Sequence, residues 1–237
     1  LSASGAAMMI LESTAVEQNG RISIKDLCLY NQKHKRNLKK LVKFIKKKSN
    51  IKLGIQISHA GRKGSCNIPW IKHNVPLKKI NSWKTIAPSP IKRAKYWPIP
   101  HEMNKSDIDF VINRFKNSAK LASQAGFDCL EIHMAHGYLL HEFFSPISNK
   151  RKDAYGGNLE NRCKFLLEVA SAVRSVWPQK KILGARITGT DHLKNGINVE
   201  DAVFLSKKLK KIGVDYISVS SGGILKKTKM KSGQAFR

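Results

Sequence analysis

Three side chains able to do chemistry on an oxygen atom lie close together in the run His133-Met-Ala-His136-Gly-Tyr138. Imidazoles donate hydrogen bonds to an anion or a carbonyl oxygen, and a phenol can deliver a proton. The run directly follows the apolar segment 127–132, which has the composition of a buried strand. The carboxyl end of such a strand is where α/β enzymes usually place their catalytic groups. The sequence therefore predicts electrophilic activation of an oxygen atom at this point of the chain.

Two other interpretations of the histidine pair stay open at the level of sequence. Imidazoles are common zinc ligands, but the spacing of His133 and His136 differs from His-Glu-x-x-His. Glu131 and Glu142 lie nearby, and no motif ties either carboxylate to a helix face shared with both histidines. The pair could also be ordinary structural histidines. Recognition of a carbonyl or an oxyanion is the favoured interpretation, and no metal site is expected.

The elements that must position these residues are short apolar runs that alternate with amphipathic segments. Strand, helix, strand in repetition predicts a parallel α/β sheet with helical crossovers. The expected strands are 6–11, 53–58, 127–133, 182–188 and 214–220, and the expected helices are 34–48, 107–125, 158–177 and 199–212.

Distinctive polar residues follow every predicted strand, which favours a (β/α)8 barrel over an open doubly wound sheet. A barrel gathers all its strand ends around one mouth, whereas an open sheet concentrates them at a switch point. No Gly-x-Gly-x-x-Gly follows any of these strands. Because five strands are too few for closure, we expect an incomplete (β/α)8 TIM barrel that forms one domain over 1–237. The proline-rich segment 60–106 is predicted to be a long loop of the kind that often covers a site.

Composition is that of a globular, intracellular protein. The chain has 237 residues and is 41% hydrophobic, which is enough for a substantial core. No run approaches the roughly 18 consecutive apolar residues of a membrane span, so no membrane association is expected. The sparse cysteines indicate neither a disulfide framework nor a zinc cluster, and a cytoplasmic location follows as the default. They are Cys28, Cys66, Cys129 and Cys163.

The formal net charge of +28 raises the alternative of a polyanion-binding surface. The distribution of the lysines argues against it, since in 38–48 apolar residues at 38, 41, 42 and 45 mark a buried stripe and lysines fill the other face. Segment 206–212 has the same arrangement. No basic motif interleaved with aromatic residues is visible, so no specific nucleic-acid partner is expected.

Five ordered strings spread along the chain resemble the old yellow enzyme family, most closely its bacterial NADPH dehydrogenase, or ene-reductase, branch. This resemblance implies a (β/α)8 barrel with FMN in its mouth, of which the chain holds approximately strands two to six. The strings are Gly54-Ile-Gln-Ile-Ser-His-Ala-Gly-Arg-Lys63, Glu131-Ile-His-Met-Ala-His-Gly-Tyr138, Phe144-Ser-Pro-Ile-Ser-Asn149, Tyr155-Gly-Gly-Asn-Leu-Glu-Asn-Arg162 and Val219-Ser-Ser-Gly-Gly223.

The resemblance also implies a role for individual residues toward the cofactor. The amide of Gln56 would contact the polar edge of the flavin pyrimidine ring, and Arg186 would lie beside its N1 and O2 atoms. Ser13 matches a position whose backbone touches the flavin, with Thr14 as an alternative. Ion pairing of Arg186 with Asp191 or Glu131 inside the barrel is compatible with this role.

For the substrate, the resemblance implies that His133 and His136 hydrogen-bond a carbonyl oxygen and that Tyr138 protonates the α-carbon. The reaction would carry hydride from NADPH or NADH through FMN to the C=C bond of an α,β-unsaturated carbonyl compound. Its partners would be a small enone and, for the full-length protein, further copies of itself.

Two alternatives to this function stay open. One is a catalytically inactive barrel fragment whose basic surface binds polyanions or a partner chain. The other is the barrel part of a flavoenzyme similar to dienoyl-CoA reductases. The family's phosphate ligands for the flavin would follow strands seven and eight, so we expect the chain as given to bind FMN weakly or not at all.

Overall fold

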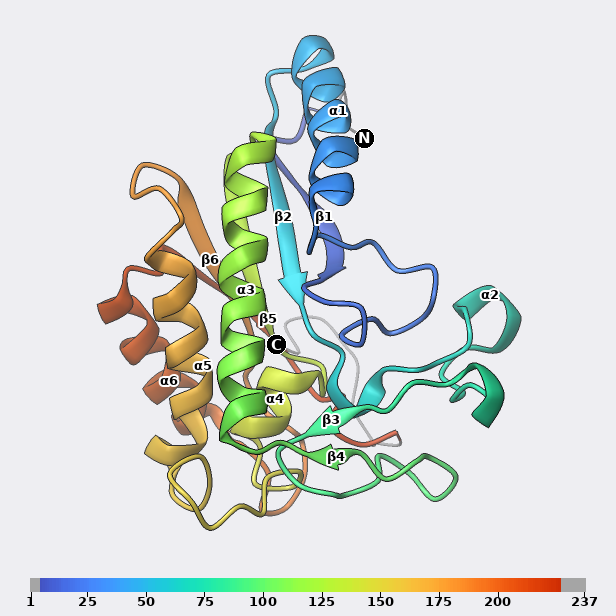
Figure 1. The fold of residues 1–237 in the computed structure, drawn as a ribbon. Coiled ribbons are helices and arrows are strands. Elements are labelled where there is room, and N and C mark those ends of the chain that lie inside the picture. Colours follow the sequence, from blue (N-terminus) through green and yellow to red (C-terminus); the bar gives the residue numbers. More distant parts are fainter. Residues whose placement is uncertain (1–4, 227–237) are drawn as a thin grey trace.

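The computed structural model describes residues 5–226, and its centre is a five-stranded parallel sheet (Figure 1). All four strand pairings are parallel, and among the described residues β1 and β7 form the two edges. This confirms the predicted parallel α/β architecture of a partial barrel. In spatial order the strands are β1 (Met8–Ala15), β2 (Lys52–Ser58), β5 (Cys129–Met134), β6 (Ile182–Thr188) and β7 (Tyr216–Ser220).

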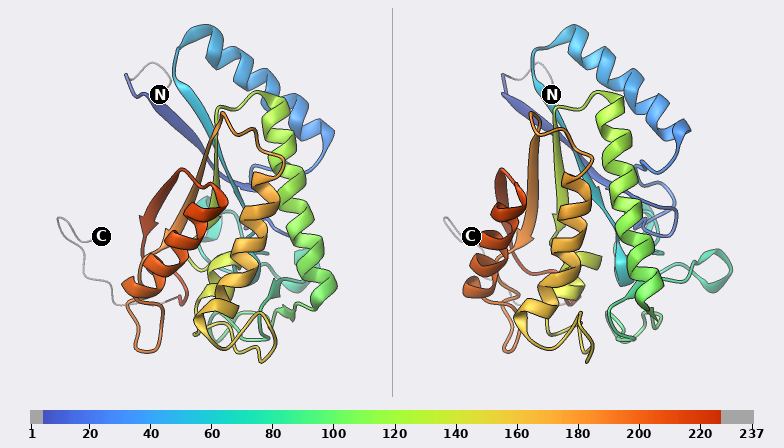
Figure 2. Two further views of the ribbon diagram at one scale, coloured as in Figure 1. Left: turned by 90° about the vertical axis from the view of Figure 1, so that its left-hand side faces the viewer. Right: turned by 60° about the vertical axis from the view of Figure 1, so that its left-hand side comes forward.

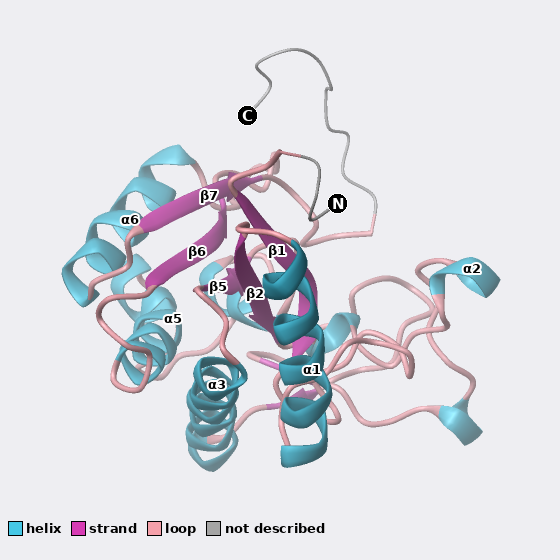
Figure 3. Cartoon of the chain, turned by 90° about the horizontal axis from the view of Figure 1, so that it is seen from above, coloured by secondary structure: helices cyan, strands magenta, loops and turns pink. Residues whose placement is uncertain are grey.

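Four long helices lie side by side along one face of the sheet (Figures 2 and 3). They are α1 (Gln32–Lys48), α3 (Lys105–Ala125), α5 (Leu159–Arg174) and α6 (Val199–Ile212). An asparagine side chain caps the first turn of each helix, and Gly126 and Gly213 end α3 and α6 in the left-handed conformation. Within the described part of the chain, none of the helices has the length and apolarity needed to cross a bilayer.

The hydrophobic core fills the space between the sheet and these helices. Alternate residues of each central strand face the helices, because side chains of a strand point to opposite faces in turn. Ile55, Ile132 and Ala185 illustrate this set, and all three are fully buried. The opposite face of the sheet carries the polar residues. Because the apolar face packs against the helices, this packing fixes the positions of the polar residues on the opposite face.

The long segment after β2 crosses the carboxyl end of the sheet (Figure 1). It contains the single turn η1 (Gly61–Lys63), the short helices α2 (Pro69–Lys72) and η2 (Lys79–Asn81), and a two-stranded ribbon of β3 (Ile86–Ala87) and β4 (His101–Glu102). The six-residue helix α4 (Leu139–Phe144) follows β5 at the same end. The predicted loop 60–106 therefore has local structure and lies beside the candidate site.

Several details differ from the sequence predictions. Helix α5 ends at Arg174 and not at 177, and β7 begins at Tyr216 and not at 214. Strand β1 continues to Ala15, past the predicted end at residue 11, with a register shift between Leu11 and Thr14. Leu41, predicted to be in the buried stripe of α1, is 39% exposed. Helix α4 is absent from the predictions, because all six of its residues are buried and the segment has no amphipathic periodicity.

Candidate active site

Strand register brings the predicted site residues to one end and one face of the sheet. His133 on β5 is in register with Arg186 on β6, and Arg186 is in register with Ser218 on β7. One layer deeper, Gln56 on β2 is in register with Glu131 on β5. Because parallel strands align their carboxyl ends, these side chains line the inner face where a barrel has its mouth.

His133 and His136 contact each other directly. Nε2 of His133 lies 3.2 Å from Nδ1 of His136, and the two rings meet edge to face. The Ala135 N–H donates to Nδ1 of His133 at 3.1 Å, so the ring proton of His133 must lie on Nε2. His136 therefore accepts at Nδ1 and donates from Nε2 to Ser220 Oγ, 2.5 Å away. The result is a directed chain of hydrogen bonds that runs from β5 to β7.

His133 is 3% exposed, and this burial controls its charge. Burial lowers the pKa of His133 well below the ordinary histidine value, and the nearby His136 and Arg186 lower it further. The imidazole is therefore neutral at physiological pH and acts as a hydrogen-bond donor through Nε2. Neutral donors of this kind suit a carbonyl oxygen on which negative charge develops.

The backbone at His136 adopts the left-handed conformation, with φ of 59°. Three side chains hold it there. The N–H of His136 donates to Thr188 Oγ1 at 3.2 Å, and its carbonyl accepts from Lys63 Nζ at 2.5 Å. The next N–H, of Gly137, donates to His141 Nδ1 at 2.7 Å. A conformation that is uncommon for a residue with a side chain is thus fixed from several elements.

Gly137 and Gly223 pack backbone against backbone beside this turn. A Cβ atom at Gly137 would lie 2.1 Å from the carbonyl oxygen of Gly223, and one at Gly223 would lie 2.7 Å from the carbonyl carbon of His136. Only glycine fits at either position. This contact joins the turn after β5 to the loop after β7 and explains the last glycine of the string Val219-Ser-Ser-Gly-Gly223.

Tyr138 lies against the other side of His133. Its ring meets the His133 ring edge to face, with 4.8 Å between centroids. Burial raises the pKa of Tyr138 to about 12, so the phenol keeps its proton at neutral pH. The three residues singled out from the sequence, His133, His136 and Tyr138, therefore form one contiguous cluster, which we call the clamp.

Gln56 lies deeper in the same face and belongs to a buried hydrogen-bond network. Its Nε2 donates to Glu131 Oε1 at 2.6 Å, and Tyr216 donates to the other carboxylate oxygen of Glu131 at 3.0 Å. The Tyr216 ring covers Gly184, where a Cβ atom would lie 2.1 Å from the ring. The network crosses four strands and holds the Gln56 amide in a fixed orientation.

Arg186 has a donor that the described residues leave unused. Its Nε atom is buried and has no hydrogen-bond partner among residues 5–226. The ion pairs considered for it are not found within this range, because Glu131 binds Gln56 and Tyr216 and because Asp191 contacts His141 at 3.0 Å. Arg186 is in register with His133, and a buried guanidinium donor at that position is suited to an anionic acceptor on a bound group.

Ser13 and Thr14 differ in where their hydroxyl groups lie. Ser13 Oγ is 2.7 Å from Ser58 Oγ, at the carboxyl end of β2. The fully buried Thr14 donates back to the Glu12 carbonyl at 2.8 Å. The geometry therefore favours Ser13 over Thr14 as the residue near the mouth.

Several residues of the site were not singled out from the sequence. Lys63, Thr188 and Ser220 contact the turn at His136, and Tyr216 completes the Gln56 network. Two other polar side chains make structural contacts near the site. His59 Nε2 lies 2.8 Å from Glu17 Oε1, and Arg162 donates to the backbone carbonyls of Phe144 and Gly157.

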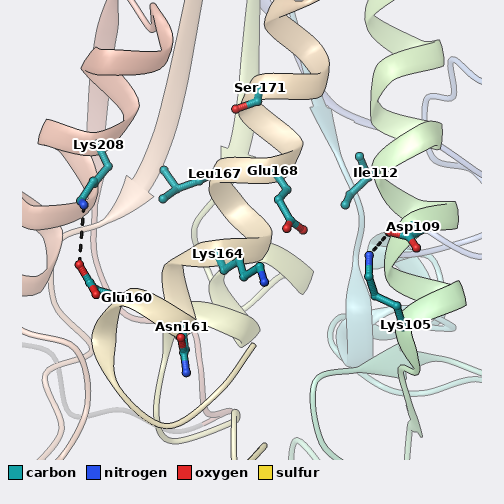
Figure 4. A pocket seen from close by; sticks show the side chains of 10 residues that line it. All are labelled: Lys105, Asp109, Ile112, Glu160, Asn161, Lys164, Leu167, Glu168, Ser171 and Lys208. Carbon is teal, nitrogen blue, oxygen red and sulfur yellow. Dashed lines mark hydrogen bonds and ion pairs between the residues drawn. The ribbon is translucent and has the colours of Figure 1, made fainter. Parts of the chain in front are cut away.

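A groove of about 670 Å³ lies outside the barrel, between α3, α5 and α6 (Figure 4). Four of its charged side chains form two ion pairs, Lys208 with Glu160 and Lys105 with Asp109. None of the residues that line the groove belongs to the clamp.

Known proteins of similar sequence include dehydrogenases and oxidoreductases. The chain is 42% identical over 218 residues to an NADPH dehydrogenase of Geobacillus sp. strain WCH70, which covers 92% of this chain and 59% of that protein. It is 40% identical to an NADH:flavin oxidoreductase of Gibberella zeae, over 98% of this chain and 60% of that protein. The chain thus spans about three fifths of the length of the curated relatives it matches.

Solved structures show the same fold. Morphinone reductase in complex with tetrahydroNAD superposes with a TM-score of 0.76 at 24% identity, over 90% of this chain and 60% of that one. TcOYE with pHBA gives a TM-score of 0.75 at 26% identity, over 91% and 62% of the two chains. The NADH:flavin oxidoreductase / NADH oxidase family matches residues 2–236. The chain therefore belongs to the NADH:flavin oxidoreductase / NADH oxidase family.

Proposed function

We propose that this chain provides the substrate clamp and part of the flavin site of an FMN-dependent ene-reductase. Its substrates would be α,β-unsaturated carbonyl compounds, with NADPH or NADH as the hydride donor. The single observation that carries the proposal is the clamp itself, in which a neutral His133, His136 and a protonated Tyr138 meet at the carboxyl end of β5.

Each clamp residue has a task that follows from its geometry. A carbonyl oxygen that accepts from Nε2 of His133 would replace Nδ1 of His136 as its acceptor, and His136 would donate to the same oxygen from Nε2 once that atom turns from Ser220 Oγ. The imidazole donors then stabilise the negative charge that develops on this oxygen, a contribution of about 3 kcal/mol for each well-placed donor. Tyr138 delivers a proton to the α-carbon, because its pKa of about 12 keeps the phenol protonated.

The residues present are suited to FMN, which when bound would carry hydride from the nicotinamide to the substrate. Arg186 offers a buried donor without a protein partner among the described residues, as an anionic ring edge requires. Gln56 offers an amide that Glu131 orients, and Ser13 lies at the mouth beside Ser58. These three residues would hold the ring, and the clamp would hold the substrate.

An anaerobic two-step experiment tests this function. Because weak binding is expected, the chain is mixed with excess FMN and bound flavin is verified first. NADPH and then cyclohexenone are added, and flavin absorbance is followed at each step. We expect bleaching by NADPH and recovery of the oxidised spectrum by cyclohexenone. Bound FMN that NADPH reduces but cyclohexenone fails to reoxidise would refute the ene-reductase assignment.

A further inference from the structure

Lys63 touches both the hydrogen-bonding and the proton-donating part of the clamp. Its ammonium group donates to the His136 carbonyl at 2.5 Å and lies 4.5 Å from the centre of the Tyr138 ring. It reaches these residues from η1, directly after β2, across 73 positions of sequence. One side chain on a neighbouring element thus contacts two of the three clamp residues.

We propose that Lys63 is a positioning residue, whose ammonium group fixes the turn at His136 and the ring of Tyr138 at the same time. This inference rests on the proposed function of the clamp. The hydrogen bond to the carbonyl stabilises the left-handed turn that directs the His136 ring toward His133. The cation over the aromatic face holds the Tyr138 ring in its orientation. The Lys63 ammonium group therefore aligns the hydrogen-bonding histidine, His136, with the proton donor, Tyr138.

The surroundings of Lys63 show that this contact is built into the fold. Its neighbour Arg62 bridges two loops, donating to the carbonyls of Ile91 and Ile224 at 3.0 and 2.9 Å. The Arg62 N–H donates to Glu142 at 3.0 Å, which anchors η1 to α4 immediately after the clamp. The side chain of Lys63 therefore extends from η1, a turn that these Arg62 contacts hold in place.

Charged groups face Lys63 from several elements. Arg93 and Arg62 disfavour its protonation, whereas Glu142 and Cys66 favour it. Burial is the main influence, and together these groups lower the pKa of Lys63 to about 7. With a pKa of about 7 the group is only partly protonated at neutral pH, and its ammonium form is the one that contacts both the His136 carbonyl and the Tyr138 ring.

The test compares Lys63→Met, Lys63→Gln and Lys63→Arg with a matched control, Lys164→Met. Lys164 also lies over a tyrosine ring, 4.9 Å from the centre of Tyr155, but it lines the outer groove. In the flavin-free chain, histidine side-chain NMR spectra report the tautomers of His133 and His136. In the FMN-loaded chain, reduction by NADPH and reoxidation by cyclohexenone are timed separately.

We expect Lys63→Met and Lys63→Gln to replace the single His136 tautomer by an averaged signal, because the turn loosens. Reoxidation by cyclohexenone should slow by about 10- to 100-fold, while reduction by NADPH stays within about twofold. Lys63→Arg should restore most of both signals, and Lys164→Met should change neither.

The two readouts separate this inference from the proposed function. If both uncharged variants keep the wild-type histidine spectrum, Lys63 does not position the clamp and the inference is overturned. An equal slowing of both flavin steps would overturn it as well. Failure of the wild-type chain to reduce cyclohexenone would instead count against the proposed function, and the NMR comparison would still decide the role of Lys63.

Discussion

Nε2 of His133 donates to Nδ1 of His136 across 3.2 Å, although His136 lies in a left-handed turn and His133 in a regular strand. The relationship depends on the backbone, since Ala135 fixes the tautomer of His133. It also depends on β7, where Ser220 Oγ accepts a hydrogen bond from Nε2 of His136. The clamp is therefore a directed network in which each ring has one defined donor, ready to be turned toward a carbonyl oxygen.

Tyr138→Phe should impair proton delivery without disturbing hydride supply. The phenol hydroxyl is the only group removed, and the packing against His133 is kept by the phenyl ring. We expect reoxidation of the reduced flavin by cyclohexenone to slow by about 100-fold or more, with the NADPH step unchanged. Anaerobic stopped-flow absorbance measures both steps. Unchanged reoxidation would remove Tyr138 from the mechanism.

Gly137→Ala should destabilise the fold and loosen the clamp, because the new Cβ meets the Gly223 carbonyl at 2.1 Å. Gly157→Ala is the matched control, since Gly157 also has positive φ but a Cβ added there would meet no atom within 4 Å. The left-handed strain should cost about 1 to 2 kcal/mol at each site, and the contact at Gly137 about 1 to 3 kcal/mol more. Urea unfolding measures both, and equal losses would show that the contact relaxes.

Glu142→Gln should flatten the pH dependence of stability. Burial raises the pKa of Glu142 to about 8, well above its ordinary value of 4.5, so the folded chain binds a proton that the unfolded chain has lost. The stabilisation is complete below the unfolded pKa and is lost as pH rises through the folded value. Between about pH 5 and about pH 8.5 the wild-type free energy of unfolding should fall more than that of the variant. Parallel curves would show that Glu142 is ionised in the fold.

Arg186→Met should weaken FMN binding, because it removes the buried donor that has no protein partner among the described residues. Arg36→Met removes the same charge from the exposed surface of α1 and is the control. Quenching of flavin fluorescence during titration gives both dissociation constants. We expect a loss of at least about tenfold for Arg186→Met alone. Similar losses in both variants would mean that net charge, not this donor, attracts the flavin.

The sequence predicts the parts of the fold and the site that depend on local pattern. Alternating apolar runs and amphipathic segments indicate the strands and helices, and parallel strands necessarily bring His133, Gln56 and Arg186 to one end. The roles given to these residues come from resemblance to relatives and stay predictions. Their convergence is a result of the fold.

Long-range contacts account for what the sequence does not predict. Lys63 ends one of the strings that carry the family resemblance, but its contact with His136 joins residues 73 positions apart and depends on the fold. Glu131 on β5 accepts a hydrogen bond from Tyr216 on β7, and β6 lies between these two strands. This contact therefore requires the strand order β5, β6, β7. Helix α4 is buried on all sides, so its pattern lacks the period that reveals a surface helix.

The most direct test of the account is the double variant His133→Ala/His136→Ala in the FMN-loaded chain. It removes both donors of the clamp and leaves Gln56 and Arg186 in place. We predict that NADPH still reduces its flavin at the wild-type rate, while reoxidation by cyclohexenone falls by at least about 100-fold. Reoxidation at the wild-type rate would contradict the assignment of the two histidines as the carbonyl clamp.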